Sequence, residues 1–154
     1  MPRAKVVRRR DEVVVEYGRE HWELLESLRE RALEVMRALA RAGVESFVHG
    51  SVARGDVHPD SDVDVVVLYP VSPPLVEEAL EIAGLPICKK EISQATPRHA
   101  VKISFYLDER TSVTFPLSRL SRLELEFYEF SGKLGLEELK RGAWVPGVNK
   151  SLLA

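Results

Sequence analysis

Two aspartates two residues apart, Asp62 and Asp64, lie where a polar turn runs into a series of valines. If the valines form a buried strand, the two carboxylates project on the same side, with Cα atoms about 6.7 Å apart. Like charges so placed repel each other unless something positive lies between them. The pair could therefore hold divalent cations together with the phosphates of a substrate.

A glycine and a serine, Gly50 and Ser51, precede the aspartates, between an expected strand and a short helix. Glycine lets the backbone approach a ligand closely, the helix start offers unpaired N–H groups, and the hydroxyl adds a donor. This combination could bind an anion, although the same pair could also be a simple helix N-cap. Asp60, Asp62 and Asp64 also follow the alternating start of an EF-hand calcium loop. That loop needs glycine at its sixth position and glutamate at its twelfth, where this chain has Val65 and Val71, so an EF-hand is excluded.

Hydrophobic periodicity predicts the elements that must position these residues. Residues 19–41 carry apolar side chains at steps of three and four, which is typical of an amphipathic helix. Shorter helices are expected over residues 75–83 and 120–130. Valine-rich or alternating runs predict strands over residues 12–16, 44–48, 63–68, 87–94, 100–107 and 111–117.

These elements favour one α/β domain of the α+β type over residues 1–154, with a mixed central sheet and flanking helices. The last two strands should form a hairpin around the turn at residues 108–110. Residues 1–10 are expected to be a basic flexible terminus, and residues 131–154 an irregular tail broken by glycines and a proline.

Composition limits the classes of function. The chain has 22 basic and 24 acidic residues and a net charge of −2, so any site for a polyanion must be local. One cysteine excludes an internal disulfide, and no apolar stretch approaches the length of a membrane span, so we expect a cytoplasmic protein. Abundant charge with a single asparagine and a single glutamine is a thermophile-like composition.

The joint pattern G-S-x-A-R-G, six residues, then D-x-D resembles the nucleotidyltransferase superfamily typified by DNA polymerase beta, and especially its minimal prokaryotic members. The residues that match are Gly50, Ser51, Arg54, Gly55, Ser61, Asp62 and Asp64. The resemblance implies a DNA polymerase beta-like fold. It also implies transfer of a nucleoside monophosphate from a nucleoside triphosphate, by family habit ATP, to an acceptor hydroxyl, with release of pyrophosphate.

By the same resemblance, Gly50 and Ser51 would bind the phosphates, with Ser61 beside them, while Asp62 and Asp64 would ligate two Mg²⁺ ions, or Mn²⁺ in their place. Arg54 could reach a phosphate or could pair with a nearby aspartate and fix the loop.

Active members of the family place a third acid on a further strand. We expect this acid to be Glu91, which is one methylene longer than the usual aspartate. Asp108, or no acid at all, remains an alternative. Phe127, Tyr128 and Phe130 could form a surface that stacks a base, although their helical spacing is more typical of a core.

The acceptor stays open: a protein hydroxyl, a small molecule or an RNA end. Two functions of another class also stay open. Minimal members of this superfamily often act as the antitoxin partner of a helical toxin, and a degenerate member would bind nucleotide without transferring it.

Overall fold

A computed structural model describes residues 5–7, 14–16, 18–143 and 145 of the chain. Its helices and strands follow one another in this order: β1 (Lys5–Val7), β2 (Val14–Glu16), α1 (Arg19–Arg41), β3 (Phe47–His49), α2 (Ser51–Arg54), β4 (Val63–Val66), α3 (Pro73–Ile82), β5 (Lys89–Ser93), β6 (Lys102–Tyr106), β7 (Thr111–Pro116), α4 (Arg122–Ser131), β8 (Lys133–Gly135) and α5 (Leu136–Lys140).

Six of the strands form one mixed sheet in the order β5-β6-β7-β4-β3-β8. All neighbours are antiparallel except β4 and β7, which run parallel. A parallel pair needs a long crossover connection, and here α3, β5 and β6 supply it. Strands β1 and β2 pair with each other in a separate two-stranded sheet. The expected α+β fold with a mixed sheet is confirmed.

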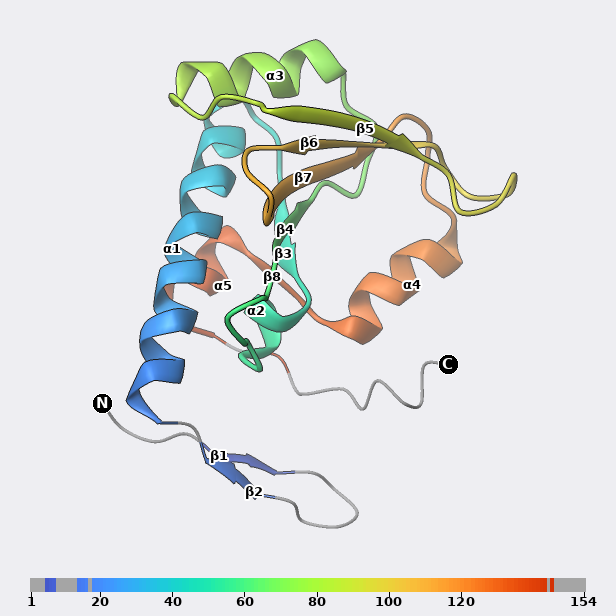
Figure 1. Cartoon of the computed structure of the whole chain (residues 1–154). Helices are drawn as coiled ribbons and strands as arrows, with labels where there is room; N and C mark the ends of the chain where they lie inside the picture. Colours follow the sequence, from blue (N-terminus) through green and yellow to red (C-terminus); the bar gives the residue numbers. More distant parts are fainter. Residues whose placement is uncertain (1–4, 8–13, 17, 144, 146–154) are drawn as a thin grey trace.

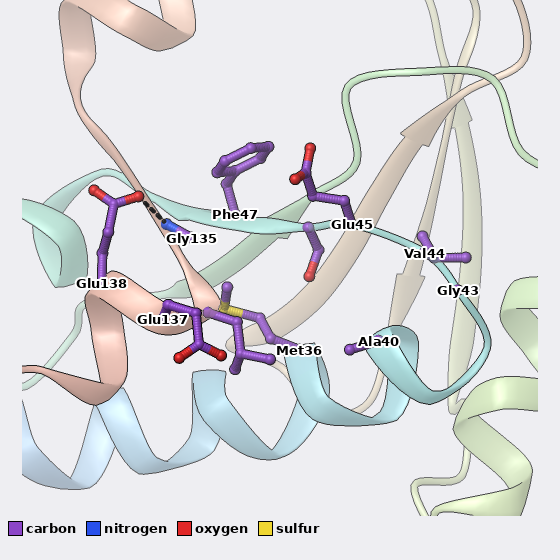
Figure 2. A pocket seen from close by; sticks show the side chains of 11 residues that line it. Met36, Ala40, Gly43, Val44, Glu45, Phe47, Gly135, Glu137 and Glu138 are labelled. Carbon is purple, nitrogen blue, oxygen red and sulfur yellow. Dashed lines mark hydrogen bonds between the residues drawn. The ribbon is translucent and has the colours of Figure 1, made fainter.

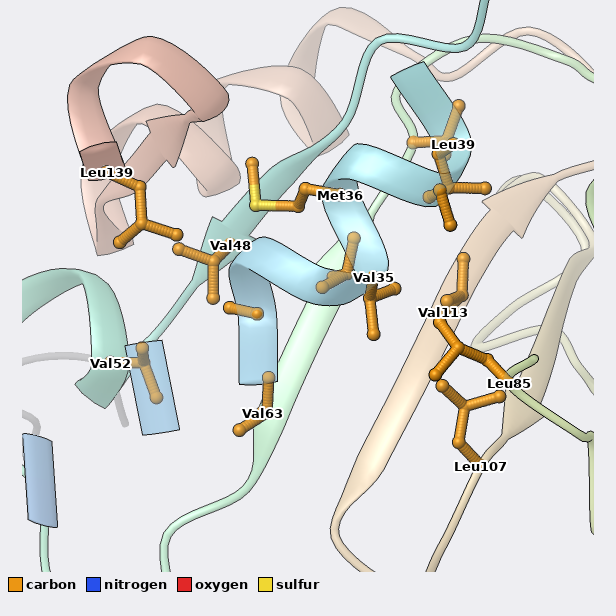
Figure 3. Close-up of a cluster of buried hydrophobic side chains, with 14 of the residues drawn as sticks. Val35, Met36, Leu39, Val48, Val52, Val63, Leu85, Leu107, Val113 and Leu139 are labelled. Carbon is orange, nitrogen blue, oxygen red and sulfur yellow. The ribbon is translucent and has the colours of Figure 1, made fainter. Parts of the chain in front are cut away.

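One face of the large sheet is closed by α1 and α3, which lie side by side (Figure 1). Val63, Val65 and Val113 point from the two parallel strands into this layer and are almost completely buried. Figure 3 shows Val35, Met36 and Leu39 of α1 in the same buried cluster as Val63 and Val113. The stripe of apolar residues in α1 is therefore buried because it forms the main contact with the sheet.

The opposite face is covered only in part, by α4, which lies across the sheet from α1 (Figure 1). A small second cluster joins Val66 of the sheet to Ala100, Leu120 and Tyr128. Ser121 caps α4 through a capping box with Glu124, which fixes where the helix begins.

The helix expected over residues 19–41 and the hairpin formed by β6 and β7 are confirmed. The strand expected over residues 44–48 is shifted, because the amide of Val44 still caps α1 through the carbonyl of Leu39 and β3 begins only at Phe47. Residues 133–140, expected to be irregular, instead form β8 and α5.

Most of the basic terminus expected at residues 1–10 lies outside the described residues, as does most of the tail after residue 143. Among the described helices, none has the length and apolarity required to cross a bilayer.

Candidate active site

The site begins where β3 ends. Gly50 follows the strand with a φ of +83°, a left-handed conformation that favours glycine, and a Cβ placed there would meet no atom of the described residues within 4 Å. The turn is therefore open to a ligand on this side. The Ser51 hydroxyl lies 3.2 Å from the Ser61 hydroxyl, which in turn accepts a bond from the amide of His58 at 2.9 Å. These bonds fold the loop after α2 back onto the turn.

The two aspartates belong to the next strand of the sheet. Val63 and Val65 of β4 point into the core, so the alternation of the strand directs Asp64 to the opposite face. Asp62 comes just before the strand, and its side chain is 57% exposed. The Asp62 carboxylate thus lies at the surface, close enough for its charge to act on the more deeply buried carboxylate of Asp64.

Asp64 is held by the parallel neighbour of its strand. The Ser112 hydroxyl of β7 donates a 3.0 Å hydrogen bond to Asp64 Oδ1, at a position where the two residues pair across the sheet. Burial raises the pKa of Asp64, the nearby charge of Asp62 raises this pKa further, and the bond from Ser112 opposes both effects. A cation between the two carboxylates would remove this electrostatic cost.

A positive charge lies at the exposed end of the pair. Arg110, in the turn between β6 and β7, contacts Asp62 at 3.6 Å and forms hydrogen bonds with the carbonyl and carboxylate of Asp60. The carbonyl of Arg110 also accepts the amide of Val63 at 2.7 Å. Neither Arg110 nor Ser112 was among the residues expected from the sequence, because both reach the site only through the parallel pairing of β4 and β7.

Of the two roles considered for Arg54, the structure shows the contact with a nearby aspartate. Its side chain is buried, contacts the Asp56 carboxylate at 3.3 Å and donates to the carbonyl of Ser131 at 3.2 Å. The amide of Gly50 donates to the carbonyl of Gly132 at 3.4 Å. The glycine turn is therefore tied to the end of α4 by two hydrogen bonds.

His49 lies between the turn and α4. It pairs with Asp64 across β3 and β4, and its ring lies 5.1 Å from the ring of Tyr128 and 6.1 Å from that of Phe127. Burial lowers the pKa of His49, and the positive charges of Arg54 and Lys102 lower it further. Within the described part of the chain, neither ring nitrogen has a hydrogen-bond partner.

The structure does not bring Glu91 to the two aspartates. Glu91 lies on β5, with β6 and β7 between it and β4. Three strand spacings separate the two strands by about 14 Å. Glu91 also pairs at the level of Ser104, Thr114 and Val66 rather than at the level of Asp64. Its carboxylate instead contacts Lys89 at 3.1 Å.

The other candidate for a third acid, Asp108, is also directed elsewhere. It contacts Arg31 of α1 at 3.2 Å and accepts the amide of Arg110 within its own turn. The residue beside Asp64 on β7 is Ser112. In the described residues no cluster of three or more histidine, cysteine, aspartate or glutamate side chains could hold a metal ion. Asp62 and Asp64 fit the oxygen-rich environment that Mg²⁺ prefers, completed by water or phosphate.

A pocket of about 440 Å³ lies away from these residues, between the end of α1 and the start of α5 (Figure 2). Its lining includes three glutamates, one of which, Glu138, accepts the amide of Gly135 at 3.2 Å. None of the residues expected to be functional lines it.

Comparison with known families gives a match over a range that contains β3, α2 and β4. A family model described as a nucleotidyltransferase domain matches residues 29–120, which is more than half of the chain and includes both the glycine turn and the aspartates. No curated protein matched the chain.

Proposed function

We propose a function from the premise that the chain belongs to the nucleotidyltransferase domain family. In this proposal the protein transfers a nucleoside monophosphate from a nucleoside triphosphate, foremost ATP, to an acceptor hydroxyl and releases pyrophosphate. The observation that supports this proposal is that Asp64 lies on the side of β4 opposite to the buried Val63 and Val65, with Asp62 just before the strand and the open turn at Gly50 after the neighbouring strand β3.

Each residue of the site has a defined part in this proposal. The Ser51 hydroxyl and the backbone at Gly50 bind the terminal phosphates, and Asp62 and Asp64 hold a divalent cation against the phosphate chain. A bound Mg²⁺ supplies Lewis acidity, which favours ionisation of the attacking hydroxyl and neutralises the leaving group. The contact of Arg110 with Asp62 is long, and both side chains are about half exposed. Water or a cation can therefore replace it at little cost.

Nucleotide binding without transfer is a second candidate, favoured by the residue beside Asp64. Ser112 stands where the parallel strand could have supplied a third carboxylate, and neither Glu91 nor Asp108 takes its place. Two carboxylates fit one cation shared with the nucleotide better than they fit a pair of ions, each of which needs its own oxygen ligands.

Incubation of the chain with each labelled nucleoside triphosphate, Mg²⁺ and host lysate tests the first candidate. The expected result is label on one acceptor, which the experiment identifies as a protein, a small molecule or an RNA end. Replacing Asp62→Asn or Asp64→Asn should reduce labelling by about 100-fold or more, since each variant weakens the cation site. Glu91→Gln is the matched control and should label as the wild type does. Undiminished labelling by the two aspartate variants would contradict the proposed chemistry.

Calorimetry and the Ser112→Asp variant separate the two candidates. If the wild type binds Mg²⁺ with ATP but labels nothing, while Ser112→Asp labels an acceptor, the protein is a nucleotide-binding member that lacks the third acid. If the wild type labels an acceptor, the two carboxylates suffice and the second candidate is excluded.

A further inference from the structure

A pocket of about 670 Å³ lies over the exposed side of α4, outside the residues given a role so far. Leu123, Phe127 and Phe130 line it at steps of four and three residues, so they form one stripe of the helix. Their exposed fractions are 72%, 52% and 59%, whereas Tyr128, which also lines the pocket, is buried. Two phenylalanine rings that do not contribute to the core thus face a concave surface.

The pocket adjoins the site proposed for the phosphates. The end of α4 is tied to the glycine turn by the bonds from Arg54 to Ser131 and from Gly50 to Gly132. At a rise of about 1.5 Å per residue, Phe130 lies roughly 3 Å and Phe127 roughly 8 Å along the helix from Gly132. The ring of Phe127 also packs beside His49, the neighbour of Asp64 in the sheet.

Polar groups lie beside the aromatic stripe. Lys102 of β6 lies 3.4 Å from the Tyr128 hydroxyl and 3.7 Å from Glu124. The Glu124 side chain is only 5% exposed, and its Oε2 accepts no hydrogen bond within the described part of the chain. An ammonium group and an under-satisfied carboxylate together offer a donor and an acceptor next to the two rings.

We propose that the α4 pocket binds the nucleobase of the donor nucleoside triphosphate, with Phe127 and Phe130 stacking on the base and Lys102 and Glu124 contacting its edge. This inference rests on the proposed function, because it places the base at the end of a triphosphate held by Gly50 and Ser51. The size of the pocket is that of a small-molecule site. Aromatic side chains stack any base, because every base has a π face.

The test compares two ligands, Mg²⁺ with ATP and Mg²⁺ with inorganic tripolyphosphate, by calorimetry. The wild type should bind ATP more tightly than tripolyphosphate. In the double variant Phe127→Ala/Phe130→Ala, affinity for ATP should fall about 10- to 100-fold, and affinity for tripolyphosphate should stay within twofold. The double variant Phe127→Leu/Phe130→Leu keeps apolar surface but removes the rings, and it should show most of the same loss.

The matched control is Ile82→Ala/Ile92→Ala, which removes two apolar side chains of other elements that are even more exposed than the phenylalanines, and it should leave both affinities unchanged. Equal binding of ATP and tripolyphosphate by the wild type would overturn the inference while sparing the phosphate site. So would an unchanged affinity for ATP in the phenylalanine variants. If those variants instead turn a dimer into a monomer at constant ATP affinity, the stripe binds a second copy of the chain and the inference is wrong. If the wild type binds neither ATP nor tripolyphosphate, both this inference and the proposed function are wrong.

Discussion

The two faces of the six-stranded sheet come from the same strands but differ in what covers them. On one face Val63, Val65 and Val113 are sealed under α1 and α3. On the other face, at the same level of the sheet, stand His49, Asp64 and Ser112, and α4 covers only part of this surface. A single residue step along β4 thus separates the hydrophobic core from the candidate site.

This difference shows how a small domain accommodates an unfavourable site. On the covered face Val63, Val65, Val113 and Phe115 are buried apolar side chains, and their burial favours folding. On the open face burial raises the pKa of Asp64, so the ionised carboxylate costs folding free energy near neutral pH. The covered face compensates for this cost. Each prediction below changes one face and leaves the other intact.

The largest effect on folding is expected from Phe115→Ala. Phe115 is completely buried on the covered face, with its ring 5.1 Å from that of Phe105. Removing such a side chain leaves a cavity and should lower the free energy of unfolding by about 3–5 kcal/mol, as measured in urea. Because the substitution does not touch the open face, protein that remains folded should still bind Mg²⁺ with ATP. A loss below about 1 kcal/mol would show that the two layers are not tightly packed.

A change of opposite sign is expected from Asp64→Asn. The raised pKa means that the ionised carboxylate destabilises the fold above that pKa, and that this cost decreases as the pH falls from the folded pKa to the lower pKa of the unfolded chain, below which the group is neutral in both states. The variant should therefore melt higher than the wild type at pH 7 without metal, by roughly 2–4 °C for each kcal/mol recovered. The difference should vanish in acid.

Ser112→Ala is the counterpart of this variant. It removes the hydrogen bond donated to Asp64, so it should lower the melting temperature at pH 7. If Asp64→Asn also melts lower than the wild type, Asp64 contributes to stability and the proposed contrast between the two faces does not hold.

The sequence predicted the covered face more completely than the open one. The spacing of apolar residues in 19–41 and the valines of β4 depend only on local periodicity, and both were confirmed. The glycine turn and the aspartates could be proposed from the sequence because they lie within one short motif, and their roles stay predictions.

What could not be predicted depends on the order of the strands. Glu91 follows α3 in the sequence, but β6 and β7 insert between its strand and β4, so proximity along the chain was misleading. Ser112 and Arg110 reach the site from the parallel partner of β4, more than 45 residues away, and local patterns carry no information on that pairing. Strand β8 follows Gly132 and ends at Gly135, so its three residues are too few to show an alternation.

A smaller effect, dependent on pH, is expected from His49. Its lowered pKa means that the folded state resists protonation, whereas an unfolded histidine takes up a proton near pH 6.5. The unfolded state therefore binds more protons below about pH 6.5, and the wild type should lose stability as the pH falls from there toward the folded pKa. His49→Phe, which keeps an aromatic ring against Tyr128, should show a weaker loss in thermal melts at pH 5 and 7.

His99→Phe is the control for this measurement, because His99 is only half-buried and forms hydrogen bonds with Gln94 and Thr96 of the same loop. It should keep the pH dependence of the wild type. An identical loss of stability in His49→Phe and the wild type would show that another group causes the acid sensitivity.

The smallest effect is expected from Glu91→Gln. This variant tests whether the order of the strands in the sheet, and not proximity along the chain, decides which acids lie near Asp64. Glu91 lies on an exposed strand and pairs with Lys89, whose side chain is 63% exposed. Exposed pairs of this kind contribute little, so the free energy of unfolding should change by less than about 0.5 kcal/mol. Mg²⁺-dependent ATP binding should be unchanged within twofold, because about 14 Å of sheet separates the strand of Glu91 from that of Asp64. A loss comparable to that of Asp62→Asn would require β5 to move against the two aspartates when nucleotide binds.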